Sequence, residues 1–184
     1  MIFTETKLKG AFVVELERRS DERGFFARAY CSGEFRTHGL TTDIAQCNIA
    51  YTKHKGTIRG LHCQTSPYEE VKFTRCMRGA VLDVIVDLRR GSETFGQYEA
   101  VELSAENGKA LYIPENFAHG YMSLTDDVIF FYQVSRPYSP GSERCIRWDD
   151  PDINICWPEM DEYIISDKDR NSQFLREIFK EAEN

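Results

Sequence analysis

Short runs in which apolar and polar residues alternate, separated by turn residues, make up most of this chain. Alternation with a period of two is typical of β-strands. The pattern predicts about ten strands, including runs at 11–17, 43–51, 57–64, 71–77, 80–88, 98–103, 109–114, 115–124 and 127–135. Helical spacing is confined to 32–39, which we expect to begin with Ser32 as N-cap and to end at Gly39, and to 171–183. We therefore expect a mainly β fold, an antiparallel sandwich or jelly roll with a short C-terminal helix.

The central stretch from Thr57 to Leu88 carries polar residues inside strand-like text, which are Arg59, His62, Gln64, Lys72 and Arg75. Counting by two places Arg59 on one face of its strand and His62 on the other. A histidine or glutamine directed into a core is costly unless it is paired or builds a site. The stretch therefore predicts a functional site.

Composition and charge exclude several classes of protein. The chain has 184 residues and a net charge of −7, and its basic residues are scattered, which argues against a nucleic-acid partner. No apolar run is long enough for a transmembrane helix, and the first residues lack a secretion signal. The six cysteines form no C-x-x-C pair, so we expect free thiols. We expect one domain over 1–184 in a cytoplasmic protein.

Several motifs fall in a fixed order along the chain. They are DERGFF at 21–26, RGLH at 59–62, VDLRRGSETFG at 86–96, ELSAEN at 102–107, IPENFAHG at 113–120, SERCIRWDDPDINICWP at 142–158 and SDKD at 166–169. Together they resemble the dTDP-4-dehydrorhamnose 3,5-epimerase family. The resemblance implies a cupin-type jelly roll and a homodimer that exchanges N-terminal strands. It also implies a nucleotide-linked 4-keto-6-deoxyhexose as substrate, with no metal and no organic cofactor.

Epimerisation beside a ketone needs a base on one face of the carbon, an acid on the other, and a group that holds the enolate charge. The resemblance assigns the base to His62, oriented by Asp169, and the acid to Tyr132. It assigns Lys72 to the developing oxyanion. Without the motifs, His62 would be taken for a core histidine and Tyr132 for an ordinary strand tyrosine. Lys72 and Asp169 would be taken for solvated charges.

The resemblance also implies a set of substrate-binding residues. Arg23, Arg59 and Lys168 would meet the diphosphate, because guanidinium groups match phosphate oxygens. Tyr138 could stack on the pyrimidine. His119 would line the sugar pocket. The remaining candidates are Gln46 and Asn48, which offer amides to the base or the phosphates, together with Glu143 and Arg28.

Some positions depart from the family pattern and leave the exact reaction open. Arg28 stands where glutamate is usual, and Cys63, Val71, Asn116 and Gln133 also differ. A different nucleotide or sugar, or inversion at C3 or C5 alone, is therefore compatible with the sequence. So are a ketoisomerase and a non-catalytic sugar-nucleotide-binding protein. A metal-dependent cupin is a further alternative, but the corresponding residues His62, Gln64, Glu70 and His119 are a poor ligand set, because such a site needs several imidazoles and only two are present.

Overall fold

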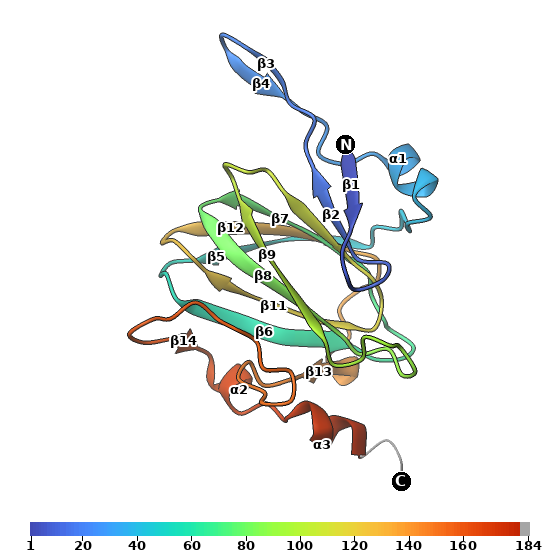
Figure 1. Cartoon of the computed structure of the whole chain (residues 1–184), viewed down its shortest axis with the longest axis vertical. Coiled ribbons are helices and arrows are strands. Elements are labelled where there is room, and N and C mark those ends of the chain that lie inside the picture. The colour runs from blue at the N-terminus through green and yellow to red at the C-terminus, as the bar shows by residue number, and fades with distance from the viewer. Residues whose placement is uncertain (181–184) are drawn as a thin grey trace.

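The computed structural model describes residues 1–180 and contains two β-sheets packed face to face (Figure 1). The first sheet has the spatial order β1 (Ile2–Glu5), β2 (Phe12–Glu15), β10 (Ala110–Ile113), β7 (Lys72–Arg78), β12 (Val128–Val134) and β5 (Gln46–Thr52). The second has the order β13 (Glu143–Cys145), β6 (Thr57–Gln64), β11 (Phe117–Ser123), β8 (Ala80–Asp87) and β9 (Tyr98–Ser104). All these strands pair antiparallel, and β14 (Ile164–Ile165) adds to β6 in parallel. The expected mainly β sandwich is confirmed.

Three apolar layers hold the sandwich together. The interior layer fills the space between the sheets with side chains such as Ile85 and Phe130. The outer face of the second sheet is covered by the segment that follows β13, through residues such as Trp157 and Leu175. The outer face of the first sheet packs against Phe35 of α1 (Ser32–Thr37). Since both faces of the central strands are buried, strand β8 is apolar almost throughout.

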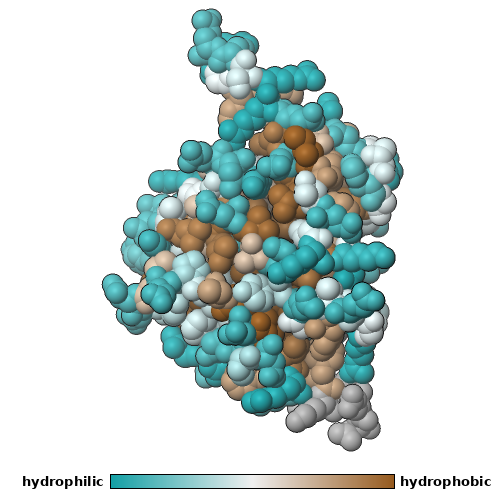
Figure 2. Space-filling model, in the orientation of Figure 1, coloured by the Kyte–Doolittle hydropathy of each residue, from teal (hydrophilic) through white to brown (hydrophobic). Residues whose placement is uncertain are grey.

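The other elements lie at the two ends of the molecule. A hairpin of β3 (Arg19–Asp21) and β4 (Gly24–Phe26) projects from the N-terminal end, and its tip is largely hydrophilic (Figures 1 and 2). The 3-10 helix η1 (Pro140–Ser142) precedes β13, and α2 (Asp167–Arg170) and α3 (Leu175–Lys180) follow β14. No helix in residues 1–180 is both long and apolar enough to cross a membrane.

The helix predictions are confirmed in part. Helix α1 begins at Ser32, but its N-cap is Cys31 rather than Ser32, and Gly39 ends it with a positive φ. The predicted C-terminal helix is present as α3, but it begins at Leu175 rather than at Asn171, and residues 181–183 of that prediction lie outside the described residues. Strand β1 and the four-residue helix α2 are too short for periodicity to predict.

A bulge in β6 overturns the predicted faces of Arg59 and His62. In the pairing with β11, His119 lies opposite His62, whereas Tyr121 lies opposite Arg59, so β6 has one residue more than its partner. One extra residue moves the side chains beyond it to the other face. Arg59 and His62 consequently line the same cleft.

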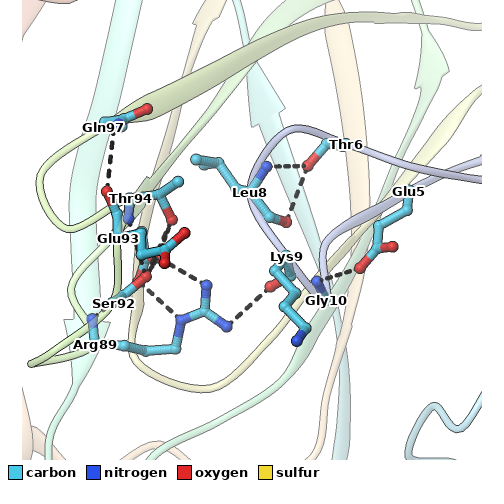
Figure 3. A network of polar contacts seen from close by, with 11 residues as sticks. Glu5, Thr6, Leu8, Lys9, Gly10, Arg89, Ser92, Glu93, Thr94 and Gln97 are labelled. Carbon is cyan, nitrogen blue, oxygen red and sulfur yellow. Dashed lines mark hydrogen bonds and ion pairs between the residues drawn. The ribbon is translucent and has the colours of Figure 1, made fainter.

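The buried carboxylate of Asp87 helps to join the turn between β1 and β2 to the β8–β9 loop. Asp87 accepts hydrogen bonds from Arg89, Ser92 and Thr94, and its side chain is fully buried. Burial opposes ionisation, but these bonds together hold the pKa of Asp87 well below its ordinary value. The guanidinium of Arg89 also donates to the carbonyl oxygen of Lys9, which joins the two loops (Figure 3).

Candidate active site

Two adjoining clefts open between the sheets, with volumes of about 590 and 330 Å³. Three predicted catalytic residues, His62, Lys72 and Tyr132, line both of them. Arg59, His119, Lys168 and Asp169 line only the large cleft, and Gln46, Asn48, Tyr138 and Glu143 line only the small one. The structure thus brings together every predicted site residue except Arg23 and Arg28.

His62 and Asp169 form a close pair although they are far apart in the sequence. His62 Nε2 lies 2.6 Å from Asp169 Oδ1. Strand β14 runs beside the start of β6, and this pairing carries α2 back to His62. Ser166 caps α2 by accepting a hydrogen bond from the backbone N–H of Asp169, and Gly60 N–H donates to Asp169 Oδ2. The carboxylate is therefore fixed before any ligand binds.

The pair changes the protonation of both residues. Burial lowers the pKa of His62, but hydrogen bonds to Asp169 and Cys145 raise it more, to about 9. Burial raises the pKa of Asp169, yet the His62 contact outweighs it, so that the pKa of Asp169 falls below its ordinary value. With Nε2–H donated to Asp169, Nδ1 is the ring nitrogen that a ligand would meet.

Tyr132 and Lys72 face His62 from the other sheet. Tyr132 lies on β12 and Lys72 on β7, while His62 lies on β6. Burial, with a smaller contribution from Glu70, raises the pKa of Tyr132, so its hydroxyl keeps its proton at neutral pH. Lys72 Nζ lies 3.2 Å from Glu70 Oε1, and both side chains are only 11% exposed. Donors on one wall therefore oppose a base on the other.

A second histidine–aspartate pair lies deeper in the sandwich. His119 Nε2 lies 2.6 Å from Asp83 Oδ1, and Asp83 also accepts a hydrogen bond from Thr74. Asp83 is fully buried, so the pair fixes the His119 ring where it lines the large cleft. Sequence reasoning missed Asp83, although a lone acid inside the apolar run of β8 signals a paired carboxylate.

The polar residues of the small cleft form a connected network. Tyr138 OH donates to Glu143, which also contacts Lys168 Nζ at 2.6 Å. Gln46 accepts a hydrogen bond from the backbone N–H of Tyr138. The ring of Tyr138 is 56% exposed and free to stack on a planar group.

Arg23 and Arg28 are not brought to either cleft of their own chain. Arg23 lies in the turn of the β3–β4 hairpin and pairs with Asp21. Arg28 follows the hairpin and pairs with Glu34 at 3.3 Å. Their assignment to the substrate stays a prediction that requires a second copy of the chain.

The residues that a metal-dependent cupin would use have other partners in the structure. Sequence reasoning did not single out Cys145, which lies opposite His62 on β13. Gln64 hydrogen-bonds Tyr68, Pro137 and Ser139, while Glu70 pairs with Lys72. Within residues 1–180, His62, Glu70 and His119 do not bring their ligand atoms within metal-binding reach of one another. The donor set expected of a metal-dependent cupin is therefore not assembled.

A known protein family matches most of the chain. The family described as dTDP-4-dehydrorhamnose 3,5-epimerase matches residues 5–177. A curated relative of that name from Methanothermobacter thermautotrophicus is 44% identical and covers 95% of both chains. A dTDP-4-dehydro-6-deoxyglucose 3-epimerase from a Streptomyces species is 39% identical and covers 91% of this chain and 86% of its own.

Solved structures agree with these relatives. The crystal structure of dTDP-6-deoxy-D-glucose-3,5-epimerase from Legionella pneumophila, in complex with dTDP-4-keto-L-rhamnose, superimposes with a TM-score of 0.92 at 35% identity. It covers 98% of this chain and 95% of its own. The similarity therefore extends over nearly the whole chain, including both sheets.

Proposed function

The chain belongs to the dTDP-4-dehydrorhamnose 3,5-epimerase family, and we propose that it inverts C3 and C5 of a nucleoside-diphosphate 4-keto-6-deoxyhexose. The preferred substrate is dTDP-4-dehydro-6-deoxyglucose, which would become dTDP-4-dehydrorhamnose. The observation that carries the proposal is the His62–Asp169 pair facing Tyr132 across one cleft.

In the proposed mechanism, His62 Nδ1 takes a proton from the carbon beside the ketone. The electron pair of the C–H bond moves into an enolate, and the ammonium of Lys72 stabilises the charge on its oxygen. Tyr132 then gives its hydroxyl proton to the opposite face of the carbon, which inverts the centre. Asp169 stabilises the imidazolium formed in the first step, as its short contact with Nε2 indicates.

The two clefts suggest how the substrate lies. The sugar would occupy the large cleft, beside His62 and His119, and the nucleotide would extend into the small one. There Tyr138 would stack on the base, with Gln46, Asn48 and Glu143 at its polar edge. Arg59 and Lys168 would meet the diphosphate from the large-cleft side, and Arg28 would add a cation from a second copy.

A homodimer with exchanged N-terminal strands would complete the site. The β3–β4 hairpin projects away from its own sandwich (Figure 1). Its residues Phe25 and Phe26 are exposed. Exposed aromatic residues on a projecting hairpin are suited to an interface. In the proposed dimer this hairpin would bring Arg23 of a second copy to the phosphates.

The remaining proposals concern organisation and location. Both sheets contribute to one site, in support of a single domain over 1–184. All six cysteines are free, as is usual in a reducing compartment, and we place the enzyme in the cytoplasm.

Proton NMR of dTDP-4-dehydro-6-deoxyglucose with the enzyme in deuterated water tests the proposed function. We expect deuterium at both C3 and C5. Deuterium at C3 alone would instead favour a single-centre enzyme, the activity for which the Streptomyces relative is named. Exchange at neither carbon would overturn the proposed substrate, and the CDP-, GDP- and UDP-linked keto sugars would then be compared.

A further inference from the structure

Three side chains with different metal-binding atoms meet beside the large cleft. Ligand atoms of His62, Cys145 and Asp169 all lie within 4.8 Å of one another. Within residues 1–180, no other three His, Cys, Asp or Glu side chains converge in this way. The three come from different elements, β6, β13 and α2, so their convergence is a property of the tertiary structure.

The register of β13 on β6 explains why Cys145 reaches His62. Leu61 and Ile146 exchange both backbone hydrogen bonds, which makes them a hydrogen-bonded pair. The next pair, His62 and Cys145, is then a non-hydrogen-bonded pair, in which the side chains approach most closely. Since β13 is a three-residue edge strand, small movements of Cys145 disturb no further strand.

We propose that His62, Cys145 and Asp169 form a binding site for a thiophilic divalent cation, with Zn²⁺ as the best match, and that the bound ion inhibits the enzyme. Only the inhibitory part rests on the proposed function. Imidazole, thiolate and carboxylate are all ordinary zinc ligands, whereas a thiolate disfavours Mg²⁺ and Ca²⁺. Three protein ligands leave a fourth position open, unlike the closed sets of structural zinc sites.

Charge and geometry both suit this ion. Lys168 Nζ forms an ion pair with Glu143 at 2.6 Å, which neutralises its charge. A Cys145 thiolate and the Asp169 carboxylate therefore present two negative charges to a divalent cation. Tetrahedral zinc places its ligand atoms roughly 3.4–3.6 Å apart. The 2.6 Å contact between His62 and Asp169 must therefore open slightly on binding. His62 is 31% exposed, which gives the ion a path from the cleft.

A bound ion would disable the base directly. Zn²⁺ takes the lone pair of His62 Nε2 and the thiolate of Cys145, and the displaced Nε2 and thiol protons pass to solvent. A neutral imidazole has one N–H and one lone pair. With the lone pair of Nε2 on the metal, the remaining proton occupies Nδ1, which can no longer accept one from the sugar.

Calorimetric titration with Zn²⁺ tests the site without reference to turnover. Chelator-treated wild type should bind one Zn²⁺ per chain, and Cys145→Ser should bind it at least tenfold more weakly. Cys156→Ser is the matched control, because Cys156 is exposed and lies outside both clefts. Co²⁺ should give a thiolate charge-transfer band in wild type and in Cys156→Ser but not in Cys145→Ser.

Solvent deuterium exchange into the keto sugar then tests inhibition. Exchange should fall in proportion to bound Zn²⁺, return on addition of EDTA, and resist Zn²⁺ in Cys145→Ser. Three results would overturn the proposed site. They are the lack of saturable Zn²⁺ binding to wild type, equal binding to wild type and Cys145→Ser, and loss of binding in both serine variants. Normal exchange in zinc-loaded wild type overturns the inhibition. Absence of exchange in metal-free wild type would count against the proposed function, while the binding curves would still decide the site.

Discussion

His62 on β6 and Tyr132 on β12 belong to different sheets, yet both line the same two clefts. The candidate base and acid therefore approach a ligand from opposite layers of the sandwich. Inversion of a carbon centre requires this opposition, because the proton must leave from one face and return to the other.

Substitution of these two residues should separate proton removal from inversion. We expect His62→Asn to lower both exchange and inversion roughly 10²–10⁴-fold, the usual contribution of a positioned base. Tyr132→Phe should abolish inversion but allow deuterium to enter from the His62 side. Proton NMR in deuterated water measures both. Tyr51→Phe, outside both clefts, is the control; inversion at the wild-type rate in Tyr132→Phe would exclude the acid role.

The pH dependence of turnover should report the His62–Asp169 pair. The base must be neutral, and the pKa of His62 is raised to about 9, so kcat/KM should rise with pH until about 9. Asp169→Asn removes the carboxylate while burial still lowers the pKa, so the midpoint should move toward or below the ordinary value of 6.5. Asp167→Asn, on the same helix but exposed, should keep the wild-type midpoint.

The His62–Asp169 pair also determines how the stability of the fold changes with pH. Since the pKa of His62 is raised in the folded state, its contribution to stability is complete below about 6.5 and is lost as pH rises through about 9. Chemical denaturation at pH 6 and pH 10 should show this loss in wild type and a smaller one in Asp169→Asn. An equal loss in both proteins would contradict the pairing.

Mixed dimers should reveal whether Arg23 acts in the cleft of a second copy. His62→Asn and Arg23→Ala should each be nearly inactive alone. In a mixed dimer with exchanged hairpins, one cleft lacks both groups and the other has both. Random mixing makes half the dimers mixed, so about a quarter of the wild-type activity should return. If Arg23 serves its own chain, no mixed dimer has an intact cleft and no activity returns.

Loss of the buried Asp87 carboxylate should destabilise the fold without changing the cleft. Asp87→Asn leaves Arg89 with a weaker partner, and we expect a loss of about 2–4 kcal/mol in the free energy of unfolding. Because the pKa of Asp87 is lowered, the wild-type advantage should persist above pH 4 and shrink at more acidic pH. Asp161→Asn, at an exposed position, should change the free energy of unfolding little.

The strands and most of the site could be predicted from the sequence because their signals are local. The alternation around His62, and the polar residues inside it, indicated both a strand and a site. The face of Arg59 could not be predicted, since the bulge depends on how β6 meets β11. There Gly60 and Gly120 pack so closely that a Cβ on Gly60 would lie 2.5 Å from Gly120 Cα.

Other features depend on contacts between distant segments. Asp169 is 107 residues from His62 and is brought to it by β14, a strand of two residues. Only the SDKD motif pointed to Asp169, since an acid in a polar tail has no signal of its own. Cys145 could not be linked to His62 without the register of β13, and the place of Arg23 depends on a partner chain.

The position of Asp169 in the chain also orders the events of biosynthesis. Every strand of the two sheets except β14 precedes Asp169 by more than twenty residues, and the chain is synthesised from its N-terminus. A growing chain therefore contains His62 and Tyr132 before it contains Lys168 and the carboxylate that holds the imidazole. On the proposed roles, both the diphosphate contact and the oriented base are completed only when residues 166–169 join the cleft.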